Sequence, residues 1–155
     1  MTRCFALVLV LNAALTLPID AIAQQDASRN LIQVEVLNLR SDNGLVGCLL
    51  FSVPDGFPGD ESKAVKAARA NISGRRAVCD FSAVAPGDYA VSVTHDENSN
   101  GRIDTNFLGM PREGVGASND AKGSFGPPKF EDARFRFGGG REDLQVHIRY
   151  LRAPF

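Results

Sequence analysis

The stretch Tyr89-Ala90-Val91-Ser92-Val93-Thr94-His95 alternates large and small side chains at every second residue. Successive side chains of a β-strand point to opposite faces of the sheet, so one face would carry the larger residues Tyr89, Val91, Val93 and His95. The turn residues Pro86-Gly87-Asp88 stand directly before it. The pattern therefore predicts a strand that packs one face against an apolar core.

Further short segments rich in apolar or β-branched residues are separated by turn residues, and we expect each to be a strand. They are 31–39, 45–53, 75–81, 133–137 and 144–151. The second of these is apolar on both faces, which favours a central strand. The pair Asn43-Gly44 lies between the first two segments and predicts a hairpin turn.

One segment favours a helix instead. Residues 60–69 follow a cluster of proline and glycine, and Asp60 or Ser62 is suited to cap a helix. The residues expected to face inward are small and apolar: Ala64, Val65, Ala67 and Ala68. A helix of this length depends on tertiary packing for its stability.

Together these elements predict an all-β fold, an antiparallel β-sandwich of immunoglobulin or transthyretin-like type. It would contain roughly six or seven strands, one short helix and a long loop over 96–132. A small barrel is the competing architecture. Loops of this length are uncommon in compact domains and are often functional.

The first residues have the features of a secretory signal peptide. Arg3 precedes a largely apolar stretch over 5–17, and Ala21-Ile22-Ala23 fits the small-x-small rule for cleavage before Gln24. We therefore expect a signal peptide over 1–23 and one domain over 24–155, exported to the periplasm or the extracellular space. An uncleaved anchor is the alternative. No later segment is apolar enough to cross a membrane as a helix.

The net charge argues against one class of partner, and the cysteine content predicts a disulfide. The net charge of −1 gives no electrostatic basis for binding nucleic acid. Cleavage of the signal peptide would remove Cys4 and leave Cys48 and Cys79, each in a segment expected to be a strand. An even number of cysteines in an exported chain predicts a disulfide, with two buried free thiols as the alternative.

The stretch Asp96-Glu97-Asn98-Ser99-Asn100-Gly101-Arg102-Ile103-Asp104 has the spacing of a calcium-binding loop. Asp96, Asn98, Asn100 and Asp104 would supply side-chain oxygens at positions one, three, five and nine, and Arg102 would supply its backbone carbonyl. Glycine at position six permits the sharp turn. Position twelve is Phe107 rather than the usual glutamate, so the missing ligand would come from elsewhere in the long loop, with Glu113 a candidate.

Two other interpretations of this loop stay open. Asp, Asn and Gly also form turns without metal, because Asn and Asp side chains bond their own backbone. The carboxylates of Asp96, Asp104 and Glu113 could instead serve as acid and base in a hydrolase. No nucleophile motif, zinc cluster or phosphate-binding loop accompanies them, which favours a binding module over an enzyme.

The remaining chemistry-bearing residues carry weaker signals. We expect His95 to end its strand at the edge of the core and His147 to be solvated on a polar face. The aromatic residues Phe107, Phe125 and Phe130 offer a surface for a protein or carbohydrate partner, or else attach the long loop to the sandwich.

The run from His95 to Gly114 resembles a bacterial secreted family, the domain of unknown function 2141 family. The resemblance rests on its His-Asp-x-Asn-x-Asn-Gly-x-x-Asp-x-Asn pattern, followed by Gly-x-Pro-x-Glu-Gly, and extends to 39–44, 86–91, 116–119 and 128–133. The resemblance implies export and a single small domain, but it does not point to any particular activity. The Pro-Gly-x-Tyr turn at 86–89 also resembles that of transthyretin-like sandwiches, which implies a tyrosine packed at a sheet corner.

Overall fold

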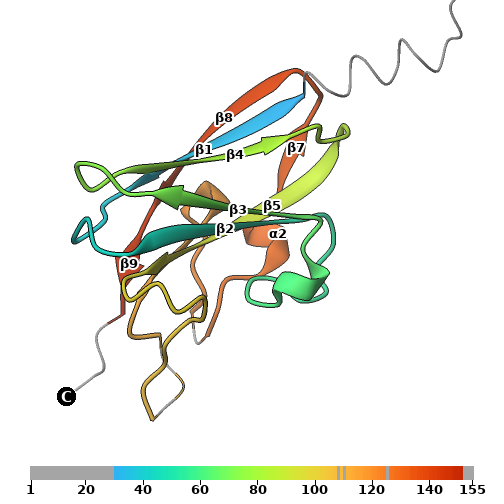
Figure 1. Ribbon diagram of the computed structural model, residues 1–155. Helices are drawn as coiled ribbons and strands as arrows, with labels where there is room; N and C mark the ends of the chain where they lie inside the picture. Colours follow the sequence, from blue (N-terminus) through green and yellow to red (C-terminus); the bar gives the residue numbers. More distant parts are fainter. Residues whose placement is uncertain (1–29, 108, 110, 125, 152–155) are drawn as a thin grey trace, which may run out of the picture.

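The computed structural model describes residues 30–107, 109, 111–124 and 126–151, and the predicted signal peptide lies outside this range. Two β-sheets pack against each other (Figure 1). The smaller sheet has the strand order β4-β1-β8, and the larger has the order β3-β2-β5-β6-β9, with β7 paired to β5. The predicted all-β sandwich is confirmed.

Several of the strands alternate in burial between inward and outward residues, as the sequence pattern requires. Their bounds are Leu31–Leu37 (β1), Leu45–Phe51 (β2), Lys66–Asn71 (β3), Ala77–Ser82 (β4), Gly87–Asp96 (β5), Gly114–Ala117 (β6), Phe135–Phe137 (β7), Arg141–His147 (β8) and Arg149–Tyr150 (β9). The helical pieces are the 3₁₀ turns Glu61–Lys63 (η1) and Ser118–Asp120 (η2) and the single turn Phe130–Ala133 (α2).

The core lies between the two sheets and is built from the inward faces of five strands. Each of these faces presents buried apolar residues at alternate positions, among them Val34, Val46, Phe81, Val91 and Val146. The disulfide between Cys48 of β2 and Cys79 of β4 crosses this core and joins the sheets. Both cysteines are almost fully buried, and the predicted disulfide is confirmed.

The turn before β5 holds the tyrosine that the sequence placed at a sheet corner. Tyr89 is buried, and its hydroxyl donates to the carbonyl of Ala85 at 2.9 Å. A second, smaller cluster packs Phe51, Ala90 and Phe130 on the other face of the larger sheet. Since side chains on both faces of β5 are buried, this strand is the central support of the larger sheet.

The predicted hairpin at Asn43-Gly44 is wrong. β1 pairs antiparallel with β4 and parallel with β8, whereas β2 pairs with β3 and β5, so the segment 38–44 crosses from one sheet to the other. Gly44 does adopt the positive φ of 75° that the Asn-Gly signal implies. A Cβ at this glycine would lie 1.9 Å from the carbonyl oxygen of Asp96, so the crossing chain passes directly against the end of β5.

The predicted helix over 60–69 is also wrong. Only Glu61–Lys63 forms a 3₁₀ turn, capped by the Asp60 side chain, and Lys66–Asn71 is the edge strand β3. Ala68 and Ala70 pack against the core, while Ala67 and Arg69 face solvent. The alanine-rich sequence is compatible with the periodicity of a helix or of a strand. Pairing with the apolar strand β2 favours the strand.

Two further boundaries differ from the prediction. The segment 96–132 contains β6, η2 and the start of α2, so only part of it is irregular. The last predicted strand is divided into β8 and β9: the N–H of Ile148 still donates to the carbonyl of Leu37 at the end of β1, at 2.9 Å, whereas Arg149 pairs with Val115 of β6. As a result β8 belongs to the smaller sheet and β9 to the larger one.

The disulfide should contribute much of the stability, because it closes a loop with a sequence separation of 31. Chain-entropy reasoning gives about 3–4 kcal/mol for a loop of this length. We expect the Cys48→Ala/Cys79→Ala variant to lose this amount in urea denaturation, and the wild type to lose a similar amount under a thiol reductant. A loss below about 1 kcal/mol would show that the sheets hold together without the bridge.

Candidate metal centre

The candidate metal-binding loop begins where β5 ends, at Asp96. Between β5 and β6 the chain projects beyond the sheets at one end of the sandwich (Figure 1). The first residue of the loop is therefore fixed by the ladder with β2, in which Asp96 is opposite Leu45. The rest of the loop depends on its own hydrogen bonds for its shape.

Those hydrogen bonds fold the loop around its first carboxylate. The two oxygens of Asp96 accept from the backbone N–H of Asn100 at 3.1 Å and of Gly101 at 2.7 Å. Asn98 and Asn100 each bond the N–H two residues on, at 3.0 and 2.8 Å, the second being that of Arg102. These are the Asx turns that Asn favours. Gly101 has a φ of 73°, as expected of the glycine at position six.

The last predicted ligand of the loop folds back onto the others. Asp104 accepts from the side-chain amide of Asn98 at 2.7 Å and from that of Asn100 at 3.1 Å. The structure therefore brings together the side chains of Asn98, Asn100 and Asp104, as the spacing predicted. Asp96 is linked to this group by the hydrogen bond that it accepts from the N–H of Asn100. Arg102 contributes its backbone N–H to the same fold.

Glu113 lies at the base of the loop, just before β6. It is 4% exposed, and its carboxylate accepts from the N–H of Glu97 at 3.2 Å and of Asp104 at 3.3 Å. Burial raises the pKa of Glu113 above its ordinary value, and the nearby charges of Asp96 and Asp104 raise it further, against the effect of the two N–H donors. Glu113 thus joins the two ends of the loop.

Acidic side chains alone do not make a metal site here. Within the part of the chain that the structure describes, no three Asp, Glu, His or Cys side chains come close enough to hold a metal by themselves. A cation at this loop would need the amide oxygens of Asn98 and Asn100 and backbone carbonyls in addition to carboxylates. Such mixed oxygen sets are what calcium uses.

A buried polar network, whose pairings have no local signature in the sequence, holds the loop onto the sandwich. His95 is fully buried; its Nε2 lies 2.8 Å from the carbonyl oxygen of Asn43 and its Nδ1 lies 2.6 Å from the Tyr150 hydroxyl. The same hydroxyl accepts the backbone N–H of Arg40 at 2.9 Å. Burial raises the pKa of Tyr150 above its ordinary value.

The Arg40 side chain extends this network to the loop. Its guanidinium lies 4.4 Å from the centre of the Tyr150 ring and pairs with the carboxylate of Glu97, which also accepts from the Ser41 hydroxyl. The hydrogen bond from Arg40 is the main cause that holds the pKa of Glu97 below its ordinary value. Glu97, the second residue of the loop, is therefore attached to the segment 38–44, which crosses between the sheets.

The expectation for His147 is corrected, and burial divides the aromatic residues between the two alternatives left open for them. His147 was expected to be solvated, yet its Nδ1 lies 2.8 Å from Asp120, which also accepts its backbone N–H at 2.9 Å. Of the three aromatics, Phe130 is buried under the larger sheet, Phe107 is 95% exposed, and Phe125 lies outside the described residues. Phe130 thus attaches the segment, and Phe107 is the one available for a partner.

The fold and the loop define a small β-sandwich protein with one inter-sheet disulfide and an Asp/Asn-Gly loop at the end of its central strand. A family model described as an uncharacterized protein conserved in bacteria, DUF2141, matches residues 34–145. The chain belongs to this family. No curated protein and no solved structure matches it.

The pairing of Glu97 with Arg40 should make stability depend on pH in acid. Because the folded-state pKa of Glu97 lies below 4.5, its contribution is present above that pH and is lost as the pH falls through the folded-state value. We expect Glu97→Gln to cost about 1 kcal/mol near neutral pH, a value discounted for partial exposure. In urea denaturation at about pH 3 the difference from wild type should shrink.

The matched control is Glu131→Gln, at an exposed glutamate on α2 with no ion pair among the described residues. This variant should be neutral at both pH values. A Glu97→Gln cost that stays the same from neutral to acid pH would show that charge is not what joins the loop to Arg40.

Proposed function

We propose that this protein is an exported β-sandwich binding module that holds a calcium ion in the Asp96–Asp104 loop. The ligands would be the side chains of Asp96, Asn98, Asn100 and Asp104 and the carbonyl of Arg102, with Glu113 supporting the loop from below. Calcium prefers six to eight hard oxygen ligands, and water would complete the set.

The observation that carries the proposal is the position of Asp104 against the two asparagine amides, at 2.7 and 3.1 Å. Amide nitrogen and oxygen exchange places by rotation about one bond. Turning both amides would break the hydrogen bonds that their oxygens accept from the N–H groups of Asn100 and Arg102. It would direct those oxygens toward the carboxylate, so that three oxygen ligands would surround one point. In the present arrangement the amide N–H groups take the place that a cation would take.

Electrostatics supports a cation at the same position. Asp96, Asp104 and the buried Glu113 are close enough for the first two to raise the pKa of the third. A divalent ion would offset this repulsion and favour the charged form of all three carboxylates. With two carboxylates in the loop itself, we expect the weak affinity of extracellular calcium modules, with Kd of roughly 10⁻⁴–10⁻³ M.

Export is part of the proposal and rests on separate support. The disulfide between Cys48 and Cys79 is suited to an oxidising compartment such as the periplasm or the extracellular space. Calcium at millimolar concentration is also an extracellular condition, and it matches the affinity expected of the loop. Among the described residues, no helix is both long and apolar enough to cross a membrane.

Calcium should raise the thermal stability of the purified protein, because an ion that binds only the folded state stabilises it by mass action. At about 5 mM calcium and the expected affinity, we anticipate about 1–2 kcal/mol, or several degrees in Tm, relative to EDTA. Magnesium at the same concentration should do much less, because it requires a tighter octahedral set of ligands.

The variants Asp96→Asn and Asp104→Asn should remove most of the calcium response. Asp132→Asn, on α2 and remote from the loop in the sequence, is the matched control and should respond as wild type does. A wild-type Tm that does not change across about 1–5 mM calcium would contradict the calcium proposal and leave the loop as a metal-free turn.

A further inference from the structure

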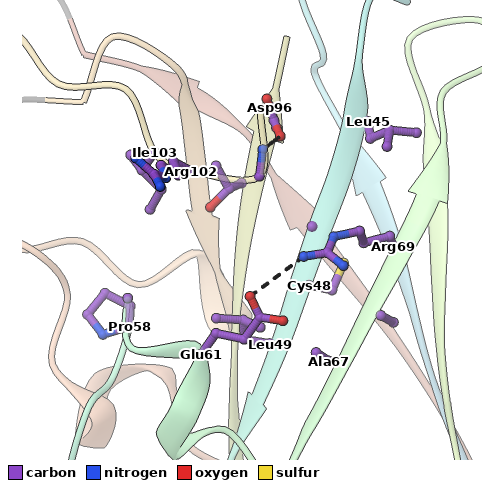
Figure 2. Close-up of a pocket in the computed structure, with 15 residues that line it drawn as sticks. Leu45, Cys48, Leu49, Pro58, Glu61, Ala67, Arg69, Asp96, Arg102 and Ile103 are labelled. Atoms are coloured by element: carbon purple, nitrogen blue, oxygen red, sulfur yellow. Dashed lines mark hydrogen bonds and ion pairs between the residues drawn. The ribbon is translucent and has the colours of Figure 1, made fainter. Parts of the chain in front are cut away.

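A groove of about 380 Å³ lies on the outer face of the larger sheet, beside the candidate loop (Figure 2). Its floor consists of outward-facing residues of β2 and β3, and Pro58 and Glu61 form one side. Gly101, Arg102 and Ile103 form the side toward the loop. The volume is within the range of small-molecule sites.

The groove exists because β2 has a glycine where its outer face would otherwise carry a side chain. In the sheet register Gly47 lies opposite Arg69 on β3 and opposite Thr94 on β5. A Cβ added at Gly47 would meet no heavy atom within 4 Å. Leu45 and Leu49 on either side of the glycine make the floor apolar.

One of the charged groups beside this floor is available to an anion. Arg69 extends across the groove toward Glu61, with a nitrogen–oxygen distance of 3.6 Å (Figure 2), and both side chains are more than half exposed. Arg102, on the loop side, has no side-chain ion pair among the described residues. The other acid of the lining, Asp96, already accepts two backbone N–H bonds within the loop. Arg102 is therefore the cation of the lining that has no carboxylate partner among the described residues.

We propose that the groove binds a small organic carboxylate with an apolar body. The apolar part lies over Leu45, Gly47 and Leu49, and the carboxylate is bound by Arg102, whose planar guanidinium group matches it. The described residues that line the groove include no aromatic side chain on which a sugar ring could stack. The site goes beyond the proposed calcium function and does not require the ion.

Titration calorimetry with sodium octanoate tests this site, with octylamine as a probe of the same apolar body and opposite charge. The purified protein is titrated both in EDTA and in calcium, so that the result does not depend on the metal proposal. We expect saturable binding of octanoate, and weaker binding of octylamine by about tenfold or more because it lacks the charge-assisted bonds.

Gly47→Leu fills the groove and should abolish octanoate binding. Gly138→Leu is the matched control, since a Cβ there also meets no atom within 4 Å and Gly138 does not line the groove. Thermal melting checks that both variants fold. Arg102→Gln should weaken octanoate binding about tenfold, the size expected for a hydrogen bond to a charged group.

Three outcomes would overturn the proposal. They are the absence of octanoate binding in both EDTA and calcium, unchanged binding in a folded Gly47→Leu variant, and equal binding of octanoate and octylamine. The calcium proposal would survive each of them, because it rests on the melting response to the ion.

Discussion

The buried imidazole of His95 is the interaction on which the loop end of this molecule depends. Because a carbonyl oxygen can only accept, the hydrogen bond to Asn43 places a proton on Nε2, and in the neutral ring Nδ1 then accepts from the Tyr150 hydroxyl. Both ring nitrogens are satisfied only if the crossing segment 38–44, the end of β5 and β9 all lie in their observed places. Leaving either nitrogen unpaired in the core would cost about 1–3 kcal/mol, so the three segments are fixed together.

From this fixed point the loop is built outward by hydrogen bonds that keep its acidic residues close to one another. Gly44 lets the crossing chain pass against the carbonyl of Asp96, and Arg40 binds the Glu97 side chain. Glu113 then closes the base of the loop from below. Burial of the Glu113 carboxyl, together with the neighbouring charges of Asp96 and Asp104, raises its pKa, so holding these carboxylates in place is unfavourable. A fold that keeps them there anyway is a reasonable host for a cation.

How far the sequence predicts this structure differs from element to element. β5 could be predicted because its alternation is strict and its inner face is buried. β3 could not, since Lys66–Asn71 is alanine-rich and its strand conformation is imposed by β2. Asn43-Gly44 marks a change of chain direction, and Gly44 has a positive φ, but the pair does not indicate which sheet the following strand joins. In the candidate loop, local spacing predicted residues of which several bond one another, whereas the contact of Arg40 with Tyr150, 110 positions apart, has no local signature.

The loop and the groove share residues, and this has a thermodynamic consequence for the two proposals. Asp96 lies opposite Leu45 of the groove floor, and Arg102 belongs to both the loop and the groove wall. A cation in the loop would add positive charge beside the groove and would fix the backbone that carries Arg102. Both effects favour a carboxylate ligand, so the coupling should be positive. Linkage then requires that the ligand raise the affinity for calcium by the same factor, which would make the module a sensor of both together.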